Sequence, residues 1–155
     1  MTNIGFFYEK ATYIFNILKS KTMNHLFLNP DFTYNRLLKE YQKYGNIVVA
    51  FDFDNTIFDY HEQGLDCTEI IDLLQKLKSI NCYLIIWTAG DDWDFIEDYC
   101  KKHHIPYDSI NENPPFFKSE SQKIYYNELL DDRAGLHESY LRLLKLYNHV
   151  LSQSH

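Results

Sequence analysis

Ile47-Val-Val-Ala-Phe-Asp-Phe-Asp-Asn-Thr-Ile57 is the stretch of sequence that decides the fold. It follows a turn signal, Tyr44-Gly45-Asn46, and it begins with apolar residues that favour strands. A short apolar run bounded by turn residues is typical of a strand that is buried on both faces, as in a parallel sheet. The sequence therefore predicts a central parallel strand that ends at aspartates.

Asp52 and Asp54 lie at the carboxyl end of this strand, where open α/β sheets bind their ligands. Because the two residues are two positions apart, strand periodicity places their side chains on the same side. Two close carboxylates repel each other, and such a pair usually persists where a cation neutralises it. From this stretch alone, a solvated Asp-rich turn after an ordinary strand is the alternative.

Composition and charge narrow the class of protein. At 155 residues the chain suits one domain with a substantial core. A formal net charge of −7 disfavours extended nucleic acid and anionic membranes as partners. No apolar run is long enough to cross a bilayer and the first residues lack a signal-peptide pattern, so we expect a cytoplasmic protein. Three cysteines without metal-ligand spacing are expected to be reduced thiols: Cys67, Cys82 and Cys100.

Apolar runs alternate with helical stripes along the rest of the chain. Strands are predicted over 82–87, near 107–110 and over 124–130, and helices over about 66–77, 91–100 and 136–151. This alternation predicts βαβ units with right-handed crossovers. We therefore expect an α/β fold, a Rossmann-like three-layer sandwich with a mostly parallel sheet.

A helical segment precedes this core. Residues from about 4 to 44 show helical spacing in two pieces, separated by Asn29-Pro30-Asp31, and either Asp31 or Thr33 is predicted to cap the second piece. We expect residues 1–45 to form a helical lead-in that packs on a core domain of residues 46–155; a lid over the site is the alternative.

Polar residues also follow two of the other predicted strands. Thr88 follows the second strand, and Asp131 and Asp132 follow the last. The carboxyl ends of parallel strands meet at one edge of a sheet, so we expect these side chains to gather near Asp52 and Asp54. Three polar strand ends in register favour a functional site over a solvated turn.

With these motifs, the chain resembles the haloacid dehalogenase (HAD) superfamily of phosphohydrolases over about residues 46–150. Motif one of that family, Asp-x-Asp-x-Thr, is matched by Asp52-Phe-Asp54-Asn-Thr56. The remaining motifs are a Thr or Ser after the next strand, a lysine before the last strand and an acidic pair after it. They are matched by Thr88, by Lys123 (with Lys118 a poorer match) and by Asp131-Asp132. Asn55 stands where glycine is commonest, and asparagine tolerates similar backbone angles.

The resemblance implies a magnesium-dependent phosphomonoester hydrolase. Asp52 would attack phosphorus in line and form an aspartyl-phosphate, and Asp54 would protonate the leaving oxygen and then activate water. Mg²⁺ would be held by Asp52, the backbone carbonyl of Asp54 and Asp132, with Asp131 orienting a bound water. An acid two residues after the nucleophile goes with phosphatases in this superfamily, although phosphotransfer to another acceptor stays open.

The resemblance also implies how the phosphate is bound. Thr88 and backbone amides near Phe53 and Gly90 would hold its oxygens, and Lys123 would offset its charge. Ordinary alternatives are a helix cap for Thr88 and a solvated charge for Lys123. The implied substrate-binding residues flank the nucleophile and the threonine; they are Phe53, Asn55, Thr56, Ala89 and Gly90.

Substrate choice in this superfamily usually lies in cap insertions, and the chain has almost no room for one. An open site suits a small phosphoester or nucleotide, which we favour marginally, and equally a phosphoprotein or polynucleotide end. Loop residues that could line its mouth are Tyr60, His61, Phe116, Phe117 and Lys118. A homo-oligomer is left open, and a non-catalytic scaffold that keeps the fold is the alternative of another class.

Overall fold

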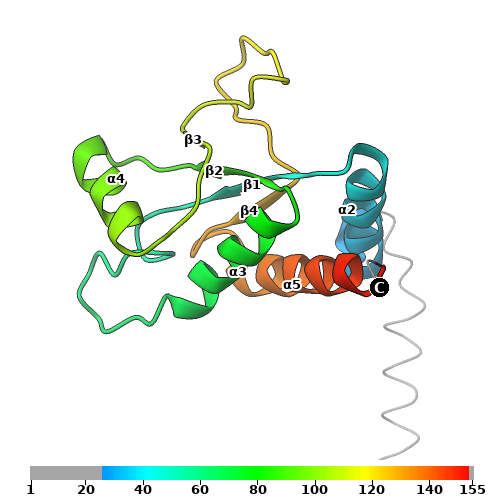
Figure 1. Ribbon diagram of the computed structural model, residues 1–155, viewed down its shortest axis with the longest axis horizontal. Coiled ribbons are helices and arrows are strands. Elements are labelled where there is room, and N and C mark those ends of the chain that lie inside the picture. Colours follow the sequence, from blue (N-terminus) through cyan, green and yellow to red (C-terminus); the bar gives the residue numbers. More distant parts are fainter. Residues whose placement is uncertain (1–25, 154–155) are drawn as a thin grey trace, which may run out of the picture. The chain divides into compact units, whose positions relative to one another are not determined.

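The computed structural model describes residues 26–153. Its elements in chain order are η1 (Leu26–Leu28), α2 (Pro30–Tyr44), β1 (Val48–Phe51), α3 (Thr68–Ser79), β2 (Tyr83–Ile86), α4 (Trp93–Lys102), β3 (Ser109–Ile110), β4 (Glu128–Leu130) and α5 (Leu136–Gln153) (Figure 1). By contacts, the chain divides into residues 1–33 and residues 34–155. The first predicted lead-in helix lies outside the described residues.

The four strands form one parallel sheet in the order β3-β2-β1-β4. Phe51 at the end of β1 lies opposite both Ile86 and Leu130, and Ile86 lies opposite Ile110. All four strands therefore end at one edge of the sheet, with β1 between β2 and β4. The predicted α/β class with a parallel sheet is confirmed. Within residues 26–153, none of the helices combines the length and the apolar character that crossing a membrane requires.

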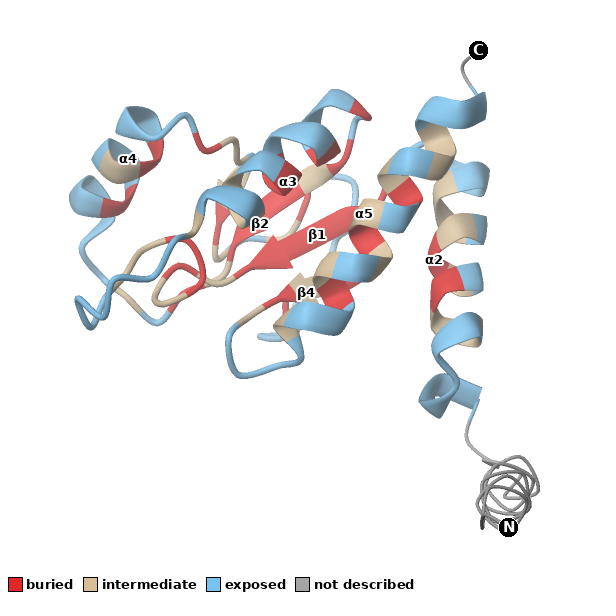
Figure 2. Cartoon of the chain, turned by 90° about the horizontal axis from the view of Figure 1, so that it is seen from below, coloured by how far each residue is buried: buried red, intermediate tan, exposed pale blue. Residues whose placement is uncertain are grey.

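The two faces of the sheet are covered differently. Val49 and Phe51 point toward the large core that α3 and α5 complete, and these two helices lie along the same face (Figures 1 and 2). Val48 and Ala50 alternate to the other face, where Ile124 packs against them. The chain between β3 and β4 supplies this third layer as an irregular segment without a helix.

The helix α2 begins differently from the prediction. The side-chain oxygen of Asn29 accepts hydrogen bonds from the backbone N–H groups of Asp31 (2.9 Å) and Phe32 (3.4 Å). Asn29 is therefore the cap, and the prediction of Asp31 or Thr33 was wrong. Pro30 occupies the first helical position, where its missing N–H costs nothing and its fixed φ suits the helix.

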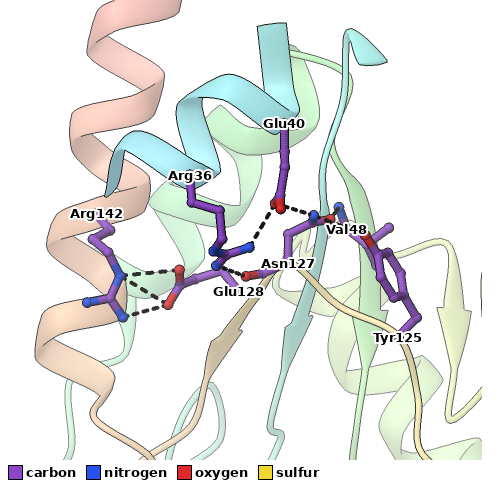
Figure 3. A network of polar contacts seen from close by, with 7 residues as sticks. All are labelled: Arg36, Glu40, Val48, Tyr125, Asn127, Glu128 and Arg142. Atoms are coloured by element: carbon purple, nitrogen blue, oxygen red, sulfur yellow. Dashed lines mark hydrogen bonds and ion pairs between the residues drawn. The ribbon is translucent and has the colours of Figure 1, made fainter. Parts of the chain in front are cut away.

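A buried ion pair fastens β4 to α5. Glu128 accepts 2.6 and 3.2 Å hydrogen bonds from the guanidinium of Arg142 (Figure 3). The hydroxyl of Ser139 donates to the same carboxylate at 2.8 Å. Glu128 and Ser139 are buried. The charges of Glu128 and Arg142 neutralise each other, so the contact joins helix α5 to strand β4 and leaves no buried charge without a partner.

A second group of polar contacts joins α2, β1 and the residue before β4. The side-chain oxygen of Asn127 accepts from the backbone N–H of Val48 (2.7 Å), and its amide donates to Glu40 (2.7 Å) (Figure 3). Arg36 donates to Glu40 (2.8 Å) and to the carbonyl of Asn127 (3.1 Å). This clamp lies at the amino ends of the strands, opposite the edge where they finish.

Candidate functional site

Asp52 and Asp131 directly follow β1 and β4 and are brought together by the sheet. The backbone N–H of Asp52 donates to the carbonyl of Leu130 at 2.9 Å, so the hydrogen-bond ladder continues one residue past β1. A pocket of about 240 Å³ opens at this edge. We name it the carboxylate pocket; its lining is Asp52, Asp54, Asn55, Ala89, Asp131, Asp132 and Arg133.

The carboxylates in this pocket destabilise each other's charged forms. Burial raises the pKa of Asp52 to about 6, and the nearby charges of Asp131, Asp54 and Asp132 add to this rise, against a hydrogen bond from the Phe53 backbone that lowers it. Burial also raises the pKa of Asp54, while His61 lowers it and Asp132 raises it. The pocket thus concentrates negative charge that the protein itself does not fully neutralise.

The donors in the carboxylate pocket fit Mg²⁺, which prefers oxygen ligands and keeps several waters. Within residues 26–153, no three or more Asp, Glu, His or Cys side chains are gathered closely enough to hold a metal through side chains alone. The ligand set implied by the HAD resemblance needs only two carboxylates, from Asp52 and Asp132, together with the backbone carbonyl of Asp54. A divalent cation there would relieve the repulsion that raises the pKa of Asp52.

Thr56 and Asn55 support the loop after β1 in different ways. Thr56 is fully buried; its hydroxyl accepts from the backbone N–H of Asp132 at 3.1 Å and makes a long, 3.5 Å contact with Asp52. Thr56 therefore positions the two acidic loops and is not open to a substrate. Asn55 has φ 57°, as its replacement of glycine predicts, and its buried side-chain oxygen has no partner among the described residues. That oxygen can accept a hydrogen bond from a ligand in the pocket.

Thr88 is held in place from two sides. Its hydroxyl accepts from the backbone N–H of Gly90 at 2.9 Å. The side chain of Asn111 accepts from the Thr88 N–H at 3.0 Å and donates to the Thr88 carbonyl at 2.8 Å. Sequence reasoning missed Asn111, although its position directly after β3 is the same signal that marks Asp52 and Asp131.

A second pocket adjoins the first and shares Asp54 and Ala89 with it. Its volume is about 350 Å³, and we name it the aromatic pocket. Its lining is Phe53, Asp54, Phe58, Tyr60, Thr88, Ala89, Gly90, Asp91, Asp92, Phe95 and Ile96. Phe53, Thr88, Ala89 and Gly90, predicted to bind substrate phosphate or to lie next to it, thus lie beside Asp54.

Lys123 is the predicted catalytic residue that the structure does not bring to this edge. It is exposed, lies before β4 and lines a separate hollow with Phe117 and Ile124. Because β4 is parallel to β1, the chain before β4 lies toward the amino ends of the strands. Arg133, which sequence reasoning did not select, lines the carboxylate pocket and is the cation nearest to the acidic pair in sequence.

The five loop residues considered for the mouth of the site lie in different places. Tyr60 lines the aromatic pocket, and His61 is close enough to Asp54 to lower its pKa. Phe116 and Phe117 instead line a hollow with Val48, at the start of β1. Lys118 lies in the loop after β3, in a hollow of its own. These last three residues line neither the carboxylate pocket nor the aromatic pocket, so the alternative of surface or packing residues fits them better.

Fold and pockets together define an α/β protein whose parallel sheet carries an acidic pocket at its carboxyl edge. The chain belongs to the family described as "Protein of unknown function (DUF705)", which matches residues 11–110. The match includes β1, β2 and β3 with Asp52, Asp54 and Thr88, and it ends before β4.

A solved structure of a conserved protein from Bacteroides thetaiotaomicron is similar, with a TM-score of 0.52 and 21% sequence identity. The similarity covers 70% of this chain and 92% of that one. At this identity the likeness supports the fold alone. No curated protein matches the chain.

Proposed function

We propose that this protein is a magnesium-dependent phosphomonoester hydrolase of the HAD type, with Asp52 as the nucleophile. The observation that carries the proposal is the gathering of Asp52, Asp54, Asp131 and Asp132 around one pocket at the end of the central strand. Thr88 next to Asp54 in the adjoining pocket supports it. A structural role alone would not require four carboxylates at the cost of their mutual repulsion.

The first step uses Asp52 and Asp54. A carboxylate oxygen of Asp52 forms a bond to phosphorus while the bond from phosphorus to the leaving oxygen breaks. Asp54 as the carboxylic acid gives its proton to that oxygen, and the raised pKa of Asp54 favours the protonated form that this step needs. The product is an aspartyl-phosphate and a free alcohol.

The second step reverses the role of Asp54. As a carboxylate it takes a proton from water, whose oxygen bonds to phosphorus while the bond from phosphorus to Asp52 breaks and releases inorganic phosphate. Mg²⁺, when bound by Asp52, Asp132 and the Asp54 carbonyl, supplies positive charge that offsets the phosphate oxygens. Arg133 adds a fixed positive charge at the same pocket, the role that the resemblance gives to Lys123.

Phosphate release tests the proposal. The full chain is assayed on a panel of phosphomonoesters with Mg²⁺ or with EDTA, beside Asp52→Asn and Asp54→Asn. Asp98→Asn is the matched control, because Asp98 is an exposed carboxylate on α4 that lines neither pocket. We expect turnover that needs Mg²⁺, falls at least about 1000-fold in Asp52→Asn and is unchanged in Asp98→Asn. Equal activity in Asp52→Asn and the wild type would exclude Asp52 as the nucleophile.

A further inference from the structure

The aromatic pocket lies where the group leaving from phosphorus has to go. It shares Asp54 with the carboxylate pocket, and Asp54 is the residue that protonates the leaving oxygen in the proposed reaction. The part of the substrate attached to that oxygen must therefore extend from Asp54. The aromatic pocket begins at that residue, so its lining selects the leaving group.

Aromatic rings form most of the apolar part of this lining, beside Ala89 and Ile96. The ring of Phe95 meets that of Phe58 edge-on, with centroids 5.2 Å apart. The ring centroid of Phe53 is 6.0 Å from that of Phe95 and 5.5 Å from that of Phe58. Phe95 is 42% exposed and Tyr60 is 59% exposed, although both rings border a hollow. Exposed rings around a concave surface offer a planar ligand both stacking and edge contacts.

The charged part of the lining has one sign. Three carboxylates border the pocket, those of Asp54, Asp91 and Asp92, and no lysine, arginine or histidine is part of its lining. Asp92 uses its side chain to cap α4 by accepting from the Phe95 N–H at 3.1 Å. Asp91 is exposed at the rim. A leaving group with a second negative charge would meet repulsion from these carboxylates, and the nearest histidine, His61, lies beside Asp54 outside the lining.

We propose that the substrate is a phosphomonoester whose leaving group is a planar aromatic ring system without negative charge, seated in the aromatic pocket. This inference rests on the proposed function. The inference narrows the substrate class of that function. It excludes as substrates nucleoside diphosphates and triphosphates, phosphorylated acids and polynucleotide ends, because all of these place further negative charge beside the leaving oxygen. Aryl phosphates and nucleoside monophosphates share the required chemistry.

Two matched substrate pairs separate ring recognition from charge recognition. Adenosine 5′-monophosphate and ribose 5-phosphate have the same leaving oxygen and differ in the base. O-Phosphotyramine and the phosphate ester of 3-(4-hydroxyphenyl)propionate have similar phenol leaving groups and differ in the sign of a distant charge. We expect kcat/KM to be higher by about two- to tenfold for the member with the base and for the cationic member, because contacts of these kinds are worth about that much. The preferred member of the pair with the larger kcat/KM shows whether the natural substrate is closer to a nucleoside monophosphate or to an aryl phosphate.

Two variants connect these preferences to the pocket. Phe95→Leu should reduce the ratio of kcat/KM for adenosine 5′-monophosphate to that for ribose 5-phosphate by about two- to tenfold. Trp93→Leu is its control, since Trp93 is 45% exposed on the same helix and does not line the pocket. Asp91→Asn should raise kcat/KM for the propionate ester relative to that for O-phosphotyramine.

The outcomes distinguish the two levels of the proposal. If turnover depends on Asp52 but neither pair shows a preference, the proposal of an aromatic leaving group is wrong and the phosphatase proposal stands. The same conclusion follows if Phe95→Leu and Asp91→Asn leave the preferences unchanged. A preference for the anionic member overturns the proposed leaving group as well. Failure to hydrolyse any of the four esters or the wider panel overturns the phosphatase, and the inference falls with it.

Discussion

Replacing Asp52 by asparagine should stabilise the metal-free protein at neutral pH. The pKa of Asp52 is raised from 3.8 to about 6, chiefly by burial and then by the surrounding carboxylates, so the folded protein holds an ionised group in an unfavourable place. The gap of about two pH units, at about 1.4 kcal/mol each, sets an upper limit near 3 kcal/mol. Because Asp52 is partly exposed, solvent screening reduces this to about 1–2 kcal/mol.

The sign of this effect depends on pH in a defined window. Below pH 3.8 Asp52 is protonated in both states, and its ionisation costs nothing. Between pH 3.8 and about 6 the folded protein keeps a proton that the unfolded chain has lost, so wild-type stability falls as pH rises. Above pH 6 the loss is complete. The advantage of Asp52→Asn should therefore be near its minimum at pH 4 and full at pH 7.5.

Urea unfolding in EDTA at pH 4 and at pH 7.5 measures the difference, with Asp98→Asn as the control. At pH 7.5 the free energy of unfolding of Asp52→Asn should exceed that of the wild type by about 1–2 kcal/mol, which in thermal unfolding is a melting temperature about 2–8 °C higher. Saturating Mg²⁺ should remove the advantage, since a ligand at 100 times its Kd adds about 2.7 kcal/mol to the state that binds it. A stability gap that does not change with pH, or a wild type that is the more stable at pH 7.5 in EDTA, would refute this reasoning.

Three further perturbations follow from contacts elsewhere. Arg142→Met leaves the buried carboxylate of Glu128 without its cation and should cost about 2–4 kcal/mol by urea unfolding; a loss under 1 kcal/mol would mean that the pair contributes little. Asn111→Leu loses both hydrogen bonds to Thr88 and strains a backbone at φ 53°, so we expect about 2–3 kcal/mol less stability. Asn111→Gly should recover the backbone part of that stability and still lower the rate of phosphate release. Iodoacetamide at pH 8 should alkylate the native protein at most once and the denatured protein three times, counted by mass, because burial raises the pKa of two thiols to about 12; the two are Cys82 and Cys100.

The bounds of β1 and β2 could be predicted from the sequence because they follow local runs of apolar residues. β1 and β2 begin and end within a residue or so of the apolar stretches, and parallel pairing then brings Asp52, Thr88 and Asp131 to the same edge. The strand predicted over 124–130 shrinks to Glu128–Leu130. The side chain of Asn127 replaces a ladder bond by accepting from Val48, which no periodicity reveals.

The failures concern residues whose place depends on tertiary structure. Lys123 is close to Asp131 in sequence, yet residues before a parallel strand and residues after it lie at opposite edges. Asn111 directly follows β3 and Arg133 is the third residue after β4, so the position after a strand that marks the aspartates also marks these two residues. Pro30 identified the start of α2, but the capping side chain proved to be the residue before it.

The ion pair of Glu128 and the clamp around Asn127 lie at the amino edge of the sheet, while the mutually repelling carboxylates lie at the carboxyl edge. The polar contacts that stabilise the fold and the residues of the proposed active site thus lie at opposite ends of the same strands. Among cells that carry random substitutions, changes at the carboxylates of the carboxyl edge should leave the steady-state amount of protein normal, and changes at the ion pair and the clamp of the amino edge should deplete it. A survey of protein abundance across such substitutions would therefore mark out the two edges of the sheet without any knowledge of the substrate.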